Sequence, residues 1–172
     1  MTVADVAGRA EVSVATVYAA YGSKEGMLRA MMTAALFGER FQKATARLEG
    51  ISDPVRLLAL TAQVARAVYD GEAEELGLLR GATAFSPALK RLEREFEALR
   101  FEMQKDRVVA LFREGRQRVG LGLDEARHIL WMYTSRDVYR MLVQESGWTP
   151  ARYEEWLSEA ILGALVAESH RA

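Results

Sequence analysis

The chain of 172 residues has no cysteine, only three prolines and no apolar run of 18 residues. The absence of cysteine excludes disulfides, thiolate metal sites and a cysteine nucleophile, and it is consistent with a reducing cytoplasm. The absence of a long apolar run predicts that no helix crosses a membrane. The first residues also lack the basic and apolar regions of a signal peptide, so we expect a cytoplasmic protein with no membrane partner.

The charge of the chain does not indicate a partner. Its 23 Lys and Arg residues nearly balance its 24 Asp and Glu residues, which gives a formal net charge of −1. A globally basic chain would indicate nucleic acid, but DNA-binding proteins often confine their positive charge to one face. Hydrophobic residues make up 50% of the chain, so it can form a sizeable core without covalent cross-links.

The three prolines predict where three helices begin. Each follows a residue that caps helices well, in the pairs Asp53–Pro54, Ser86–Pro87 and Thr149–Pro150. Proline is favourable at the first helical position because the N–H group that it lacks would be unpaired there anyway. Apolar periodicity predicts a helix after Pro54, a long helix from 87 to about 116, and helices over roughly 124–146 and 150–168. No segment alternates like a strand, so we predict an all-α fold.

Residues 2–28 carry the most specific pattern, which indicates a helix, a tight turn, a second helix, another turn and a third helix. Thr2, Ser13 and Ser23 are suited to cap these helices. The residues expected to face inward are Val3, Val6, Ala7, Ala10, Val12, Val17, Met27, Leu28 and Met31. The second helix is expected to be exposed, as in a helix-turn-helix, where it enters the major groove of DNA.

Seven residues of this segment are candidate DNA contacts. Short side chains let a helix backbone approach the groove floor, and a threonine can contact a phosphate or a thymine methyl group. Tyrosine and lysine suit phosphate oxygens, whose contacts position a protein without reading sequence. The candidates are Thr2, Ser13, Ala15, Thr16, Tyr18, Tyr21 and Lys24.

The same segment resembles the DNA-binding segment of the tetracycline-repressor (TetR) family. The positions that match the family pattern are Thr2, Val6, Ala7, Ala10, Val12, Ser13, Thr16, Val17, Tyr18, Ser23, Lys24, Glu25 and Leu28. The resemblance implies a helix-turn-helix region with a connecting helix over residues 1–46, and a helical effector-binding and dimerisation domain over 47–172. It implies a transcriptional regulator, most often a repressor, that binds a palindromic operator in double-stranded DNA as a homodimer. An unknown small-molecule effector would release it from DNA.

Three features depart from the family pattern. The family has a further helix before the position of Thr2, so the three-helix DNA-binding domain is expected to be incomplete here. Glu11 stands where the family usually has a turn glycine, and a left-handed backbone is unfavourable for glutamate. Ala19 and Ala20 replace polar residues that often contact DNA. The first departure leaves an alternative function, a ligand-binding helical homodimer that does not bind DNA.

Two further sets of residues are candidate contacts in the body. The resemblance implies a dimer interface built by the last two helices, and a terminal amphipathic helix needs a partner for its apolar face. We predict this interface at Tyr139, Leu142, Tyr153, Trp156, Leu157, Ile161 and Leu165, with packing of the stripe inside the subunit as the alternative. Aromatic and soft side chains line ligand pockets. The candidate effector contacts are Tyr69, Phe85, Phe101, Met103 and Trp131.

Patterns typical of enzymes and metal sites are incomplete in this sequence. Glu125 and His128 have the Glu-x-x-His spacing of di-iron bundles, but such a site needs two copies and further carboxylates. Gly120 and Gly122 begin a dinucleotide-binding pattern that lacks its third glycine and its preceding strand. We therefore predict no catalytic residues, no metal and no cofactor, and a helical-bundle enzyme is the least favoured hypothesis.

Overall fold

A computed structural model describes residues 2–75 and 87–171, and this part of the chain is built from α-helices. Apart from one isolated bridge between Gln117 and Val166, the described residues contain no β-structure. The predicted all-α class, an N-terminal helix-turn-helix followed by a helical body, is confirmed. None of the helices in these two ranges is both long and apolar enough to cross a membrane.

The helices are α1 (Val3–Arg9), α2 (Val14–Tyr21), α3 (Lys24–Phe37), α4 (Glu39–Ala46), α5 (Pro54–Glu75), α7 (Pro87–Met103), α8 (Lys105–Arg113), α9 (Leu123–Tyr133), α10 (Arg136–Tyr139) and α11 (Pro150–Leu165). A π-helical turn, Arg140–Glu145, follows α10, and a 3-10 turn, Glu168–His170, follows α11. The helices expected to begin at Pro54, Pro87 and Pro150 therefore do so. Thr149 caps the last of them, because its hydroxyl oxygen accepts the N–H of Arg152 at 3.2 Å.

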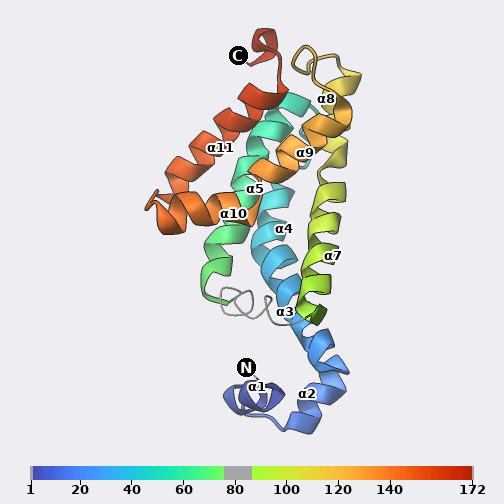
Figure 1. The fold of residues 1–172 in the computed structure, drawn as a ribbon, viewed down its shortest axis with the longest axis vertical. Helices are drawn as coiled ribbons and strands as arrows, with labels where there is room; N and C mark the ends of the chain where they lie inside the picture. The colour runs from blue at the N-terminus through green and yellow to red at the C-terminus, as the bar shows by residue number, and fades with distance from the viewer. Residues whose placement is uncertain (1, 76–86, 172) are drawn as a thin grey trace.

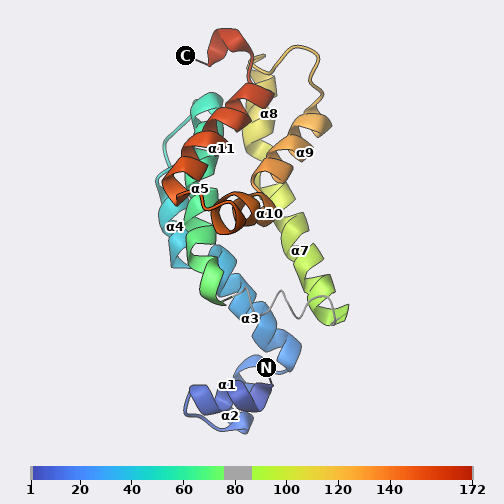
Figure 2. The same cartoon turned by 60° about the vertical axis from the view of Figure 1, so that its left-hand side comes forward.

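The N-terminal helices lie apart from the body. In Figure 1, α1 and α2 occupy one end of an elongated molecule, and α3 leads from them to the other helices. The C-terminus lies at the opposite end, beyond α11, and Figure 2 shows the same arrangement from another side. Apart from α3, no other labelled helix covers α1 and α2 in either view.

The main core lies between α5 and α11, with contributions from α8, α9 and α10. Its fully buried side chains include Leu58, Leu111, Leu130, Tyr153 and Leu157. Full burial of one such side chain stabilises the fold by about 1.5–3 kcal/mol relative to exposure. This packing therefore accounts for a large part of the stability of the body.

Two predicted long helices are interrupted, which corrects the sequence prediction. The predicted helix from 87 to about 116 is divided at Gln104 into α7 and α8, and the predicted helix over 124–146 is divided after Tyr133 into α9, α10 and the π-helical turn. At the second break the Thr134 hydroxyl donates to the carbonyl of Leu130 at 2.8 Å, and the Thr134 carbonyl accepts from the Tyr69 hydroxyl at 2.8 Å. These contacts satisfy carbonyl groups at the end of α9. They come from tertiary packing, so local periodicity does not reveal them.

Two small clusters connect the N-terminal helices to the body. The first joins α1, α2 and α3 through buried Val3, Ala7, Val17 and Met27. The second joins α3 to α7 through buried Leu28, Met32, Leu89, Leu92 and Phe96. The helix α3 belongs to both clusters, so it connects α2 to α7.

Candidate DNA-binding surface and ligand cavity

Each N-terminal helix begins at the capping residue that the sequence predicts. The Thr2 hydroxyl oxygen accepts the N–H of Asp5 at 3.2 Å, and the Asp5 carboxylate accepts the Thr2 N–H at 2.6 Å. The Ser13 hydroxyl oxygen accepts the N–H of Thr16 at 3.0 Å. The Ser23 hydroxyl oxygen accepts the N–H of Gly26 at 3.0 Å. These bonds satisfy N–H groups that have no partner inside a helix, and they fix where α1, α2 and α3 start.

The turn between α1 and α2 differs from the prediction at Val12. Glu11 adopts the expected left-handed backbone, with φ of 53°, and the Val12 N–H donates to the carbonyl of Ala7 at 3.0 Å. The Val12 side chain is 42% exposed, so the expectation that it faces inward between the helices is wrong. Ala10 is also exposed rather than inward. The backbone hydrogen bond, rather than the valine side chain, closes this turn.

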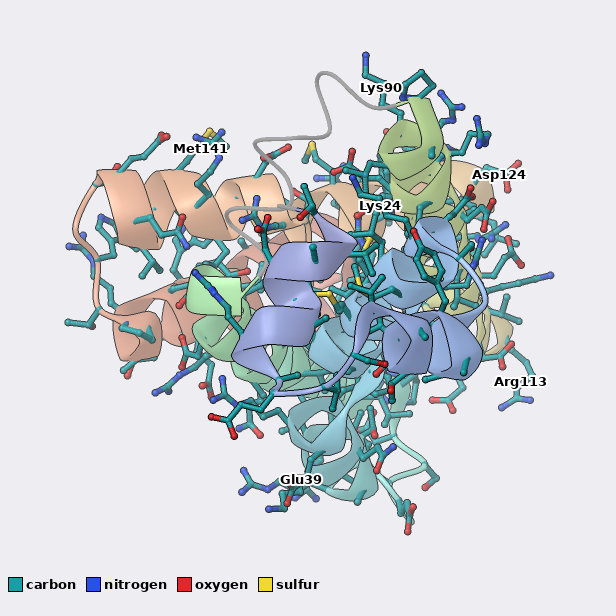
Figure 3. The ribbon with its side chains drawn as sticks, turned by 90° about the horizontal axis from the view of Figure 1, so that it is seen from below. Lys24, Glu39, Lys90, Arg113, Asp124 and Met141 are labelled. Carbon is teal, nitrogen blue, oxygen red and sulfur yellow. The ribbon has the colours of Figure 1, made fainter. Side chains whose placement is uncertain are left out.

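All seven candidate DNA contacts lie on the surface. Thr2, Ser13, Ala15, Thr16, Tyr18, Tyr21 and Lys24 are exposed. Within this set, the Ser13 and Thr16 hydroxyls share a hydrogen bond of 2.8 Å. Figure 3 views the molecule from the end that carries α1 and α2 and places Lys24 beside them. Their roles in DNA binding stay predictions, but their exposure meets the first requirement for contact.

Positive charge near α2 is sparse. Residues 1–31 contain three basic side chains, Arg9, Lys24 and Arg29, and three acidic ones, Asp5, Glu11 and Glu25. Arg29 forms an ion pair of 2.7 Å with Glu95 on α7, and Glu25 lies 3.7 Å from Arg91 on the same helix. The two exposed cations Arg9 and Lys24 have no ion pair among the described residues. They are therefore the cations best placed to meet phosphate.

Gly26 allows α2 and α3 to approach closely, which sequence reasoning missed. A Cβ atom at Gly26 would lie 2.1 Å from the carbonyl oxygen of Tyr21, the last residue of α2. No side chain fits at that distance, so the angle between the two helices depends on this glycine. A glycine in the first turn of a predicted helix is unusual, and this was the available signal in the sequence.

Comparison with known proteins agrees with this geometry. Residues 1–31 match the family model described as bacterial regulatory proteins, tetR family. The N-terminal segment of this chain is therefore similar to that of TetR-family regulators. A search of curated proteins and a search of solved structures each found no match. The TetR-family match ends within α3 and leaves the helical body outside it.

The apolar stripe of α11 faces the interior of its own subunit. Tyr153, Leu157, Ile161 and Leu165 are 0% exposed and Tyr139 is 4% exposed in the single chain, where they pack in the main core with α5. A side chain with no exposed surface has nothing left to offer a partner, so these five predicted interface positions require correction. Leu142 and Trp156 are half-buried. The stripe indicated a buried face correctly, but periodicity does not distinguish the subunit core from a dimer interface.

A cavity of about 140 Å³ lies between α3, α4, α5, α7 and α8. Apolar side chains dominate its wall, and the aromatic ones are Phe37, Phe41, Tyr69 and Phe96. Of the candidate effector contacts, Tyr69 and Met103 lie in this wall. Phe101 and Trp131 instead form an edge-to-face pair with centroids 6.4 Å apart, outside the lining residues. Phe85 lies outside the described residues.

Proposed function

We propose that this protein is a homodimeric transcriptional repressor whose α2 helices enter the major groove of a palindromic operator. A small molecule bound in the cavity lowers its affinity for DNA. The observation that carries the proposal is the position of α2, which lies exposed at the free end of the molecule within the segment that matches the TetR family. In this proposal residues 1–46 form the DNA-binding unit, and residues 47–172 form the effector-binding and dimerisation unit.

We expect α2 to read its operator through apolar contacts. The helix has the sequence VATVYAAY, which contains no Arg, Lys, Asn, Gln, Asp or Glu. It therefore lacks the side chains that form bidentate hydrogen bonds with base edges. The exposed methyl groups of Ala15 and Ala19 suit the C5-methyl group of thymine. The operator should accordingly present thymines to α2, while Arg9 and Lys24 hold the phosphate backbone.

A second copy is expected on the outer face of α9 and α11. Met132 is 49% exposed, and Ile129, Tyr133 and Trp156 are half-buried. The rings of Tyr133 and Trp156 meet edge to face with centroids 6.1 Å apart, so the two helices present one continuous surface. Two helices from each copy would form a four-helix bundle around a two-fold axis. A two-fold axis also relates two copies of α2, as a palindromic site requires.

This interface is tested by the mass of the protein in solution. Met132→Glu places a charge in the proposed apolar interface and should convert the dimer to a folded monomer in light scattering. Leu99→Glu is the matched control, because Leu99 is 46% exposed and belongs to α7, which is not part of the proposed interface. A Met132→Glu protein that remains dimeric would exclude this face as the interface.

Ligand binding is expected to reach α2 through α3 and α4. Phe37 and Phe41 line the cavity from these helices, and their rings meet edge to face with centroids 5.3 Å apart. Between them, a Cβ atom at Gly38 would lie 2.1 Å from the carbonyl oxygen of Ala34, so the bend between α3 and α4 depends on glycine. A ligand that binds better when these rings are displaced would shift α3 and therefore α2. The ligand would weaken DNA binding to the extent that it binds the displaced position of α3 more tightly than the original one.

The DNA-binding function is tested by footprinting of the purified protein on the promoter of its own gene. We expect protection of two half-sites whose centres lie one DNA turn, about 34 Å, or a multiple of it apart. Protection should weaken steeply as salt is raised. A folded dimer that protects no sequence at low salt would contradict DNA binding and favour the alternative, a ligand-binding helical dimer.

A further inference from the structure

The cavity wall contains a half-buried cation without a counterion. Arg107 on α8 lines the cavity, and its Nη1 donates to the Thr61 hydroxyl at 2.8 Å. No carboxylate lies within ion-pair distance of this guanidinium in the part of the chain that the structure describes. Burial lowers the pKa of Arg107, and no neighbouring charge compensates. A guanidinium stays protonated in such surroundings, so a positive charge remains unpaired in an apolar cavity.

The acidic side chain in the cavity wall, Glu97, already has a cationic partner. Both Nε and Nη2 of Arg100 donate to the Glu97 carboxylate, at 3.1 and 2.6 Å. Trp131 Nε1 donates to the same carboxylate oxygen at 3.0 Å. Arg100 also donates through Nη1 to the Thr134 hydroxyl at 2.8 Å. Glu97 and Arg100 therefore neutralise each other, whereas the charge of Arg107 is left for another group.

Gln104, one helical turn before Arg107, carries a second polar group without a partner among the described residues. Its Nε2 donates to the Thr134 hydroxyl at 2.8 Å, while its buried Oε1 has no hydrogen-bond partner among the described residues. Exchange of the two amide atoms would not satisfy it, because the Thr134 hydroxyl hydrogen is already donated to the carbonyl of Leu130. The cavity wall thus contains one unpaired cation, Arg107, and a residue, Gln104, whose buried acceptor atom is unpaired. Buried polar groups of this kind are ordinarily satisfied.

The size and walls of the cavity define the rest of the ligand. Its volume of about 140 Å³ is close to the roughly 150 Å³ that holds a benzene ring in a protein interior. Phe37, Phe41 and Phe96 provide aromatic surfaces around it, and Phe37 and Phe96 contact each other with centroids 5.9 Å apart. A single flat ring fits this volume, whereas a long acyl chain or a nucleotide does not.

We propose that the cavity binds a small aromatic carboxylic acid, with the carboxylate on Arg107 and the ring among Phe37, Phe41 and Phe96. The regulatory consequence rests on the proposed function of the preceding section, but the binding site does not. A carboxylate ligand both pairs the charge of Arg107 and fills the apolar volume. A neutral ligand of the same shape fills the volume but leaves the charge unpaired.

The proposal is tested by calorimetric titration of the full chain with benzoate and with benzamide, its neutral isostere. We expect benzoate to bind at least about tenfold more tightly, because hydrogen bonds to charged groups are the stronger ones. The Arg107→Gln variant should lose this preference. Arg113→Gln should keep it, because Arg113 is an exposed cation on the same helix, outside the cavity wall and at the edge of the molecule in Figure 3.

Three results would overturn the proposal: equal affinity for the two probes, a preference that survives in Arg107→Gln, or failure of benzoate to bind at millimolar concentration. The comparison of the two probes on the unaltered chain needs no variant, so it decides even if Arg107→Gln folds poorly. DNA retardation is measured separately. If the chain binds promoter DNA but not benzoate, the proposed ligand class is wrong and the proposed DNA-binding function is unaffected. If benzoate binds but does not change the affinity for DNA, the binding site is supported and its regulatory role is excluded.

Discussion

Replacement of Gly26 by alanine tests how α2 is held in position. Gly26 lies in the first turn of α3, against the last residue of α2. The added Cβ atom would lie 2.1 Å from the carbonyl oxygen of Tyr21 and 3.3 Å from its carbonyl carbon. Both are backbone atoms, which a change of rotamer does not move. The turn between α2 and α3 must therefore open.

The size of the effect follows from this distance. Separation of the two atoms from 2.1 Å to the 3.0 Å lower limit of real contacts requires a movement of 0.9 Å. Overpacking of this kind costs about 1–3 kcal/mol, and the replacement of a helical glycine offsets about 0.5–1 kcal/mol. The midpoints of these two ranges leave a net loss of about 1.25 kcal/mol in the free energy that holds α2 in place, which raises the opened population roughly 8-fold.

Amide hydrogen exchange of α2 measures this population directly. Exchange should accelerate in Gly26→Ala while the α5 and α11 amides stay unchanged, because the buried residues of the affected cluster, Val3, Ala7, Val17 and Met27, all lie in α1, α2 and α3. Gly8→Ala is the control, since a Cβ atom at Gly8 in α1 meets nothing within 4 Å. It should slow exchange slightly through better helix propensity. Equal α2 exchange in Gly26→Ala and the unaltered chain would refute this reasoning.

Three further predictions concern DNA contact and the core. Lys24→Ala should weaken binding equally for all DNA sequences. The slope of log affinity against log salt should become shallower by about 0.9 per lost phosphate contact, or roughly 1.8 for a dimer. An unchanged slope would remove Lys24 from the phosphate contacts, and exposed Arg113→Ala is the control. Replacement of an operator thymine that faces α2 by uracil should lower affinity about fourfold, since burial of one methyl group stabilises a complex by about 0.8 kcal/mol. The same change outside the footprint should have no effect. Equal losses of affinity at both places would argue against recognition by apolar contacts. Tyr153→Phe should leave the free energy of unfolding unchanged or raise it by up to about 1 kcal/mol, because the buried Tyr153 hydroxyl has no partner among the described residues. Tyr69→Phe should lower it by about 1 kcal/mol, because it breaks the 2.8 Å bond to the Thr134 carbonyl; the reverse order in urea unfolding would contradict the hydrogen-bond assignment.

The sequence alone determined the local features of this protein. The caps at Thr2, Ser13 and Ser23 and the helix start at Pro150 depend on residues no more than three positions apart. Interactions of that range leave a fixed pattern in the sequence, because the same side chain always meets the same backbone N–H group. For that reason the helix-turn-helix and the all-α class could be predicted before any packing was known.

Only the tertiary structure decided what each helix face meets. The apolar stripe that contains Leu157 and Ile161 indicated a buried face, which could pack either inside the subunit or against a second copy. In the structure it packs against α5 in the subunit core. The separation of α9 from α10 depends on Tyr69, which lies 65 positions away from Thr134. Arg107 carries no distinguishing signal in the sequence, and only the fold places it in the cavity wall. Burial depends on contacts between distant segments, and local periodicity does not record them.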